Sequence, residues 1–344
     1  MKEQATTVLL VIVLVNLGLL MQVSPSSMLA MDQTKKIMYE FKNIVQLSSI
    51  NTSSSERTSG DEPLRLVAYA PYESGASTIE QMKVDLKLAK DIGFDGIKLW
   101  NIRDLLKDDN LPKILDIGEE LGLKFNLPLM VGNPYDFPDD NESIAEFKTY
   151  LSKLTEIVKG RDNVLWYGLW YPIAWKRSVL WNQQNMARTK YQQTLQEFVD
   201  VLKENDPEHE VRLFADFDLT IYRLPKNFSN VDGYGVQPYS RIKDSIDGDR
   251  IKSYVSYFLD TGKPVYIDEW GLHTSNNWVS GTCTDEETKA RVLTDFVSFV
   301  EGEGLTWTYF LLLDSKLYKI DWGILNENRT LRLSGQILNE SFFH

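Results

Sequence analysis

The chain has 344 residues, of which 43% are hydrophobic and 25% are charged, the composition of an ordinary globular protein. Its formal net charge of −12 argues against a nucleic-acid partner, because such binding depends on neutralising phosphates with basic residues. The single cysteine, Cys283, excludes an intrachain disulfide, and three histidines are too few for a His-rich metal site. No cofactor and no metal are predicted, so any catalysis is expected to depend on carboxylates.

The N-terminal part differs from the remainder in composition. Residues 5–31 carry no charge and are strongly apolar, which predicts either a signal peptide or a retained single transmembrane anchor. Residues 32–63 read as an amphipathic helix followed by a Ser/Thr-rich linker. The protein is therefore predicted to be extracellular or at the cell surface. Asn-x-Ser/Thr triplets, which suggest a glycoprotein, begin at Asn51, Asn141, Asn227, Asn328 and Asn339.

Residues 64–344 alternate between short apolar runs and longer amphipathic runs. Strands are predicted at 64–72, 94–100, 124–132, 163–170, 211–218, 231–239, 264–270 and 305–313, with helices in the intervals. The first helix is expected to begin with Ser77 as its N-cap and to stop at Gly93. Eight strand–helix units predict a (β/α)8 TIM barrel. An open doubly wound sheet is the alternative, but no Gly-rich phosphate loop follows the first strand.

In such a barrel, the residues at the C-terminal strand ends face one shared site. The aromatic rings, amides and carboxylates found there suit a sugar, which has apolar faces and a rim of hydroxyl groups. Several of the aromatic residues could equally plug the barrel. The predicted substrate-binding residues are Glu73, Trp100, Trp170, Tyr171, Gln237, Tyr239, Trp270 and Trp307, and the predicted catalytic residues are Glu269 and Asp216.

Three segments resemble the clan A glycoside hydrolases, in particular the cellulase-like glycoside hydrolase family 5. They are YIDEWG at 266–271, GVQPY at 235–239 and the final TWTYFLLLDS…DWGILNENRTLR. The resemblance implies that Glu269 is the nucleophile of a retaining mechanism and that Tyr239 hydrogen-bonds to it. It also matches Trp322 and Gly323 to the turn that follows the last strand of the family.

The sequence departs from the family at three positions. The family has a Glu acid/base at the end of strand four, where this chain reads YGLWYPIAW without a carboxylate. Lys98 stands in place of an arginine, and Gln237 in place of a histidine. A retaining glycosidase needs a second carboxyl group as its acid, for which Asp216 is the first candidate and Glu73 the second. The alternative to a surface hydrolase is a degenerate barrel that binds carbohydrate or serves as a structural or interaction protein.

Overall fold

A computed structural model of the protein describes residues 62–129, 138, 140–170, 181–216, 226–239, 245–274, 285–315 and 321–342. The chain divides into two units, Met1–Gly60 and Asp61–His344. The first unit, with the predicted signal peptide or anchor and most of the linker, lies outside the described residues. None of the helices that are described is long and apolar enough to cross a membrane.

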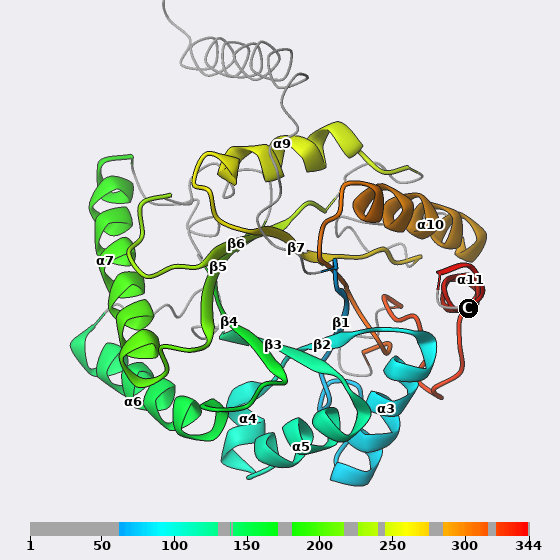
Figure 1. The fold of residues 1–344 in the computed structure, drawn as a ribbon, viewed down its shortest axis with the longest axis horizontal. Helices are drawn as coiled ribbons and strands as arrows, with labels where there is room; N and C mark the ends of the chain where they lie inside the picture. Colours follow the sequence, from blue (N-terminus) through cyan, green and yellow to red (C-terminus); the bar gives the residue numbers. More distant parts are fainter. Residues whose placement is uncertain are drawn as a thin grey trace, which may run out of the picture. The chain divides into compact units, whose positions relative to one another are not determined.

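The second unit is a closed barrel of parallel strands in the order β1 to β8 (Figure 1). The ring closes where Leu66 of β1 pairs with Thr308 of β8. This architecture confirms the predicted TIM barrel and rules out the open sheet. The strands are β1 (Arg65–Tyr69), β2 (Gly96–Leu99), β3 (Lys124–Leu129), β4 (Val164–Trp170), β5 (Glu210–Asp216), β6 (Gly233–Gln237), β7 (Val265–Trp270) and β8 (Trp307–Tyr309).

The helices surround the ring of strands, as Figure 1 shows. They are α3 (Ile79–Ile92), α4 (Ile102–Lys107), α5 (Leu111–Leu121), α6 (Asn141–Val158), α7 (Trp181–Asn205), α9 (Gly248–Leu259), α10 (Glu286–Gly302) and α11 (Leu333–Phe342). The short helix α4 was not predicted. The last helix, α11, packs against both α10 and α3, so the C-terminal segment lies beside the first helix of the barrel.

Short polar side chains fix where the helices begin. Asp140, Asp247 and Asp285 each accept a hydrogen bond from the backbone N–H three residues later. At α3 the cap is Thr78 and not the predicted Ser77, because Thr78 accepts from the N–H of Gln81. The N–H of Ser77 donates instead to the side chain of Gln81, which completes a capping arrangement.

The lower half of the barrel interior, at the N-terminal ends of the strands, is filled by a cation and two aromatic rings. The guanidinium of Arg212 on β5 lies 3.8 Å from the ring centroid of Trp166 on β4 and 5.1 Å from that of Tyr266 on β7. Leu66 packs with the same two rings. The barrel is therefore closed at this end, and the groups that could meet a ligand lie at the other.

Candidate active site at the mouth of the barrel

A bulge in β7 turns two consecutive carboxylates toward the barrel axis. Ile267 pairs with Trp307 of β8 and Trp270 pairs with Tyr309, so Asp268 and Glu269 together face the single residue Thr308. In a regular strand, neighbouring side chains point to opposite faces. The extra residue lets Asp268 and Glu269 both contact Lys98 of β2, which is three strands away around the ring. We call the C-terminal end of the strands, where Glu269 stands, the mouth.

Lys98 of β2 is completely buried and forms an ion pair with both carboxylates. Its Nζ atom lies 2.6 Å from Oδ2 of Asp268 and 3.0 Å from Oε2 of Glu269. Burial by itself lowers the pKa of Lys98, but the two carboxylates outweigh it, and the pKa stands above its ordinary value. Lys98 is therefore a fixed positive charge at the position where the family pattern has an arginine.

Strand β6 supplies one hydrogen bond to each carboxylate. The hydroxyl of Tyr239, just beyond the strand, donates to Oε1 of Glu269 at 2.6 Å, and the amide of Gln237 donates to Oδ2 of Asp268 at 2.7 Å. The contact between Tyr239 and Glu269 is the one that the family resemblance implies. Asp268 also accepts from the hydroxyl of Tyr266 at 3.1 Å. With three partners and no exposure, Asp268 is suited to positioning Lys98 and not to meeting a ligand.

Glu269 is 7% exposed and both of its oxygen atoms are held. Burial is the largest influence on this carboxyl and raises the pKa of Glu269, while Lys98 and Tyr239 act in the opposite direction. A carboxylate that is oriented by a tyrosine and a lysine, at the open end of a barrel, has the arrangement of a nucleophile for an electrophilic carbon.

Aromatic side chains pack around Tyr239, which holds this carboxylate. Tyr239, Trp100 and Trp322 belong to one apolar cluster together with Phe310. The ring of Trp322 lies 5.7 Å from that of Tyr239 and 5.5 Å from that of Phe310, centroid to centroid. Such rings can stack on the apolar faces of a sugar. Trp322 and Phe310 were not among the predicted site residues, although the family turn motif already contained Trp322.

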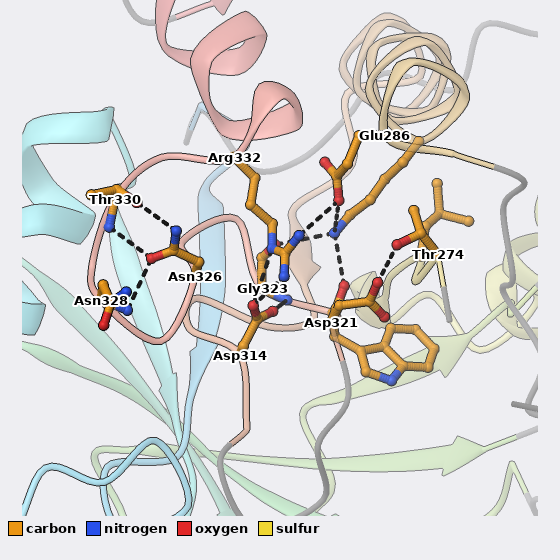
Figure 2. A network of polar contacts seen from close by, with 12 residues as sticks. Thr274, Glu286, Asp314, Asp321, Gly323, Asn326, Asn328, Thr330 and Arg332 are labelled. Carbon is orange, nitrogen blue, oxygen red and sulfur yellow. Dashed lines mark hydrogen bonds and ion pairs between the residues drawn. The ribbon is translucent and has the colours of Figure 1, made fainter. Parts of the chain in front are cut away.

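A second ion-pair network fixes the turn that carries Trp322 (Figure 2). Arg332 binds Asp314 and Glu286, and Asp314 accepts the N–H of Gly323 at 2.8 Å. The buried ammonium of Lys289 donates to the carbonyls of Asp321 and Gly323 at 3.0 and 3.1 Å. Both oxygen atoms of Asp314 are thereby committed to holding the turn.

Two predicted substrate-binding residues lie elsewhere, and their assignment was wrong. Trp270 faces outward and stacks on Phe296 of α10, with ring centroids 3.8 Å apart. The β7 bulge explains this, because the extra residue exchanges the faces that Glu269 and Trp270 would otherwise take. Trp307 is also fully buried outside the barrel, between Phe94 and Phe296.

The structure describes the remaining predicted site residues to different extents. Trp170 ends β4 and is buried, on the inner face that it shares with Trp166 and Gly168. Asp216 ends β5 in register with Gln237, but its side chain lies outside the described part of the chain. Tyr171 lies outside it altogether.

Glu73 is half-buried in the turn after β1, and its Oε1 atom accepts from Asn101 at 3.4 Å. Among the described residues, no group of three or more acidic, histidine or cysteine side chains could hold a metal ion.

Solved structures share this barrel at low sequence identity. A GH5_18 protein from Streptomyces cattleya in complex with GlcNAc superposes with a TM-score of 0.66 at 14% identity, covering 82% of this chain and 80% of its own. The chain has the barrel fold of the clan A glycoside hydrolases. No protein-family model matches the sequence, and no curated protein matches it significantly.

Two further proteins with this clan A fold are similar over most of the present chain. Bacteroides uniformis β-glucuronidase 2, covalently bound to cyclophellitol-6-carboxylate aziridine, has a TM-score of 0.66 at 14% identity, and the match covers 82% of this chain but 36% of the glucuronidase. An active-site mutant of Rhizomucor miehei β-1,3-glucanosyltransferase with laminaritriose has a TM-score of 0.60 at 16% identity, covering 79% and 96%. At these identities the likeness concerns the fold alone.

Proposed function

We propose that this protein is a retaining glycoside hydrolase that acts on a glycan or polysaccharide, with Glu269 as its nucleophile. One observation carries the proposal. Glu269 stands at the mouth of a clan A barrel and is held between the hydroxyl of Tyr239 at 2.6 Å and the ammonium of Lys98 at 3.0 Å.

Each of these residues has a part in the proposed reaction. A carboxylate oxygen of Glu269 attacks the anomeric carbon, the glycosidic C–O bond breaks, and a glycosyl ester forms that water later hydrolyses. Tyr239 and Lys98 oppose the effect of burial on the pKa of Glu269 and orient its carboxylate for the attack. They stabilise it again when the ester is hydrolysed and the carboxylate leaves.

A sugar ligand agrees with the surroundings of Glu269 and with the structural neighbours. The partly buried ring of Trp100, which packs in one cluster with Tyr239 and Trp322, offers a stacking surface. The neighbours were solved with GlcNAc, with laminaritriose and with cyclophellitol-6-carboxylate aziridine. We further propose that the protein acts outside the cell, on the basis of the uncharged apolar segment at residues 5–31.

Replacing the nucleophile tests the proposal. Wild type and Glu269→Gln should be assayed on 2,4-dinitrophenyl β-glycosides of glucose, GlcNAc and glucuronic acid, whose good leaving group needs no acid. We expect the wild type to hydrolyse at least one of them and the variant to fall to background. Glu120→Gln, which changes an exposed carboxylate on α5, should match the wild type. A Glu269→Gln protein that is folded and fully active would contradict the assignment.

A second candidate function is carbohydrate binding without cleavage. It is favoured by the end of β4, where Trp170 stands at the place of the family acid. A binder would retain measurable affinity for laminari- or chito-oligosaccharides in calorimetry while hydrolysing none of the activated glycosides. The binding and hydrolysis assays of the wild-type protein therefore distinguish the two functions.

A further inference from the structure

The ends of β1 and β2 carry polar groups that lack partners in the described part of the chain. The indole N–H of Trp100 and the side-chain oxygen of Asn101 are both buried without a hydrogen bond. Beside them, Glu73 accepts one long hydrogen bond, from Asn101 to its Oε1 atom at 3.4 Å. Buried polar atoms without partners are costly, and a ligand with hydroxyl groups would satisfy them.

This group adjoins the proposed nucleophile through Trp100. The ammonium of Lys98 lies 4.9 Å from the ring centroid of Trp100 and 3.0 Å from Oε2 of Glu269. Trp100 also packs in the same apolar cluster as Tyr239, which holds the other oxygen of Glu269. Trp100 therefore lies beside the cation that holds Glu269, and the next residue, Asn101, donates to Glu73.

The other described carboxylates at the mouth are already committed. Asp268 lies beneath Glu269 and is bound by Lys98, Gln237 and Tyr266. Asp314 is bound by Arg332 and by the N–H of Gly323. Glu73 has an oxygen atom with no described partner, so it can form a hydrogen bond to a ligand.

Building on the proposed function, we propose that Glu73 is the relocated acid/base of the reaction and that Trp100 and Asn101 bind the leaving-group sugar beside it. As Glu269 attacks the anomeric carbon, the electron pair of the breaking C–O bond passes to the glycosidic oxygen. That oxygen takes the proton of the Glu73 carboxylic acid. The resulting Glu73 carboxylate then accepts a proton from the water that hydrolyses the ester, which restores both carboxyl groups.

The environment of Glu73 agrees with this role. Burial raises the pKa of Glu73, and the hydrogen bond from Asn101 opposes this only in part. No basic residue forms an ion pair with Glu73 in the part of the chain that the structure describes, so its proton is retained to higher pH than that of an exposed glutamate.

Substrates with different leaving groups test the proposal. Wild type, Glu73→Gln and Asp104→Asn, a control on exposed residue 104 of α4, should be assayed on a 2,4-dinitrophenyl glycoside and on the phenyl glycoside of the same sugar. We expect Glu73→Gln to lower kcat/KM on the phenyl glycoside by about 10²–10⁴-fold, the usual contribution of a general acid. The loss of kcat/KM on the dinitrophenyl glycoside should be far smaller. The fall in activity at high pH, which reflects ionisation of Glu73 in the wild type, should be absent from Glu73→Gln. Added azide should accelerate the breakdown of the glycosyl ester in this variant.

The outcomes separate this inference from the proposed function. Equal losses of Glu73→Gln on both substrates, or no loss on either, would overturn the role of Glu73 and leave Glu269 as the nucleophile. A wild type that hydrolyses neither substrate would overturn both. Glu73→Asp provides a second variant, for which we expect a partial loss confined to the phenyl glycoside.

Discussion

At the scale of single residues, Lys98 carries the charge that two neighbouring carboxylates share. It is fully buried, as is Asp268, and Glu269 is nearly so. Each charge inside the barrel is tolerated because the others compensate it, and removing one member of such a group costs far more than removing an exposed ion pair. From the resemblance alone, Lys98 was only a lysine at a position where the family has an arginine. The structure shows that Lys98 contacts both carboxylates of the candidate site.

Replacing Lys98 should therefore destabilise the fold. We expect Lys98→Met to lower the free energy of unfolding by about 3–5 kcal/mol, since Asp268 and Glu269 lose their cation. The matched control is Lys83→Met, which breaks an exposed pair with Glu120 and should cost about 0–1 kcal/mol. Urea unfolding of both variants measures the difference. Equal stability of the two variants would mean that the buried ion pairs contribute little.

The activity should depend on pH through Glu269. Burial raises its pKa, so the folded protein keeps this proton to higher pH than the unfolded chain. The carboxyl then contributes stability at low pH that is lost as pH rises through the folded pKa. Attack needs the ionised form, so kcat/KM should rise with pH along a limb above the ordinary glutamate pKa of about 4.3.

The variant Tyr239→Phe tests whether ionisation of Glu269 causes the rise of kcat/KM with pH, which we call the acidic limb. The variant removes a hydrogen bond that lowers the pKa of Glu269, so the limb should move to still higher pH. A limb that stays in place, or moves to lower pH, would show that another group controls it.

At the scale of the elements, the bulge in β7 decides which side chains reach the mouth. It brings Glu269 inward with Asp268 and sends Trp270 outward onto α10. Gly235 on the neighbouring strand β6 has no side chain and so leaves space for Asp268 of β7. A Cβ atom on Gly235 would lie 2.8 Å from Cβ of Asp268 and 2.9 Å from Cβ of Phe214.

Filling that space should disturb the site. We expect Gly235→Ala to cost about 1–3 kcal/mol of stability, because neither neighbour is the end of a flexible side chain. Gly302→Ala is the control, since a Cβ atom there meets nothing within 4 Å, and it should be neutral or stabilising by up to about 1 kcal/mol. Thermal unfolding of the two variants compares them. An unaffected Gly235→Ala would indicate that β6 and β7 can separate locally.

At the scale of the whole molecule, the barrel closes on itself between β1 and β8. A second connection adds to the pairing of β1 with β8. Arg329, in the turn before α11, binds both carboxylate oxygens of Asp85 on α3. Asp85 also accepts from the hydroxyl of Tyr69 on β1 at 2.7 Å. The last and first strand–helix units are thus joined by buried polar contacts, and every strand finds both of its neighbours between residues 65 and 309.

The barrel should consequently fold without the N-terminal segment. We expect residues 61–344 expressed alone to unfold in one cooperative transition at nearly the temperature of the full chain, with unchanged kcat/KM on the same glycosides. Calorimetry and the glycosidase assay measure both properties. A truncated chain that aggregates or unfolds at much lower temperature would show that residues 1–60 contribute to the stability of the barrel.

The sequence predicted the architecture better than it predicted the site. Strand–helix alternation is repeated along the chain and survives local errors, so it was enough to predict the barrel. The pairing of Tyr239 with Glu269 came from the family resemblance and not from the alternation. Trp270 was misplaced because a one-residue bulge reverses the faces of β7 and leaves no mark in composition. Trp307 was misplaced because it begins β8 and its ring packs outside the barrel against Phe94 and Phe296. Helix α4 was missed because it spans six residues and its N-cap, Asn101, forms no side-chain cap.

In the proposed reaction Glu269 becomes covalently bound to the sugar, so trapping this glycosyl ester identifies the nucleophile. The wild-type protein should be incubated with a 2,4-dinitrophenyl 2-deoxy-2-fluoro-β-glycoside of the sugar it hydrolyses, then digested and analysed by mass spectrometry. We predict one fluorosugar per chain, attached to the peptide that contains Glu269. Attachment to a different carboxylate would contradict Glu269 as the nucleophile, and hydrolysis of the parent glycoside with inversion at the anomeric carbon would contradict the retaining mechanism.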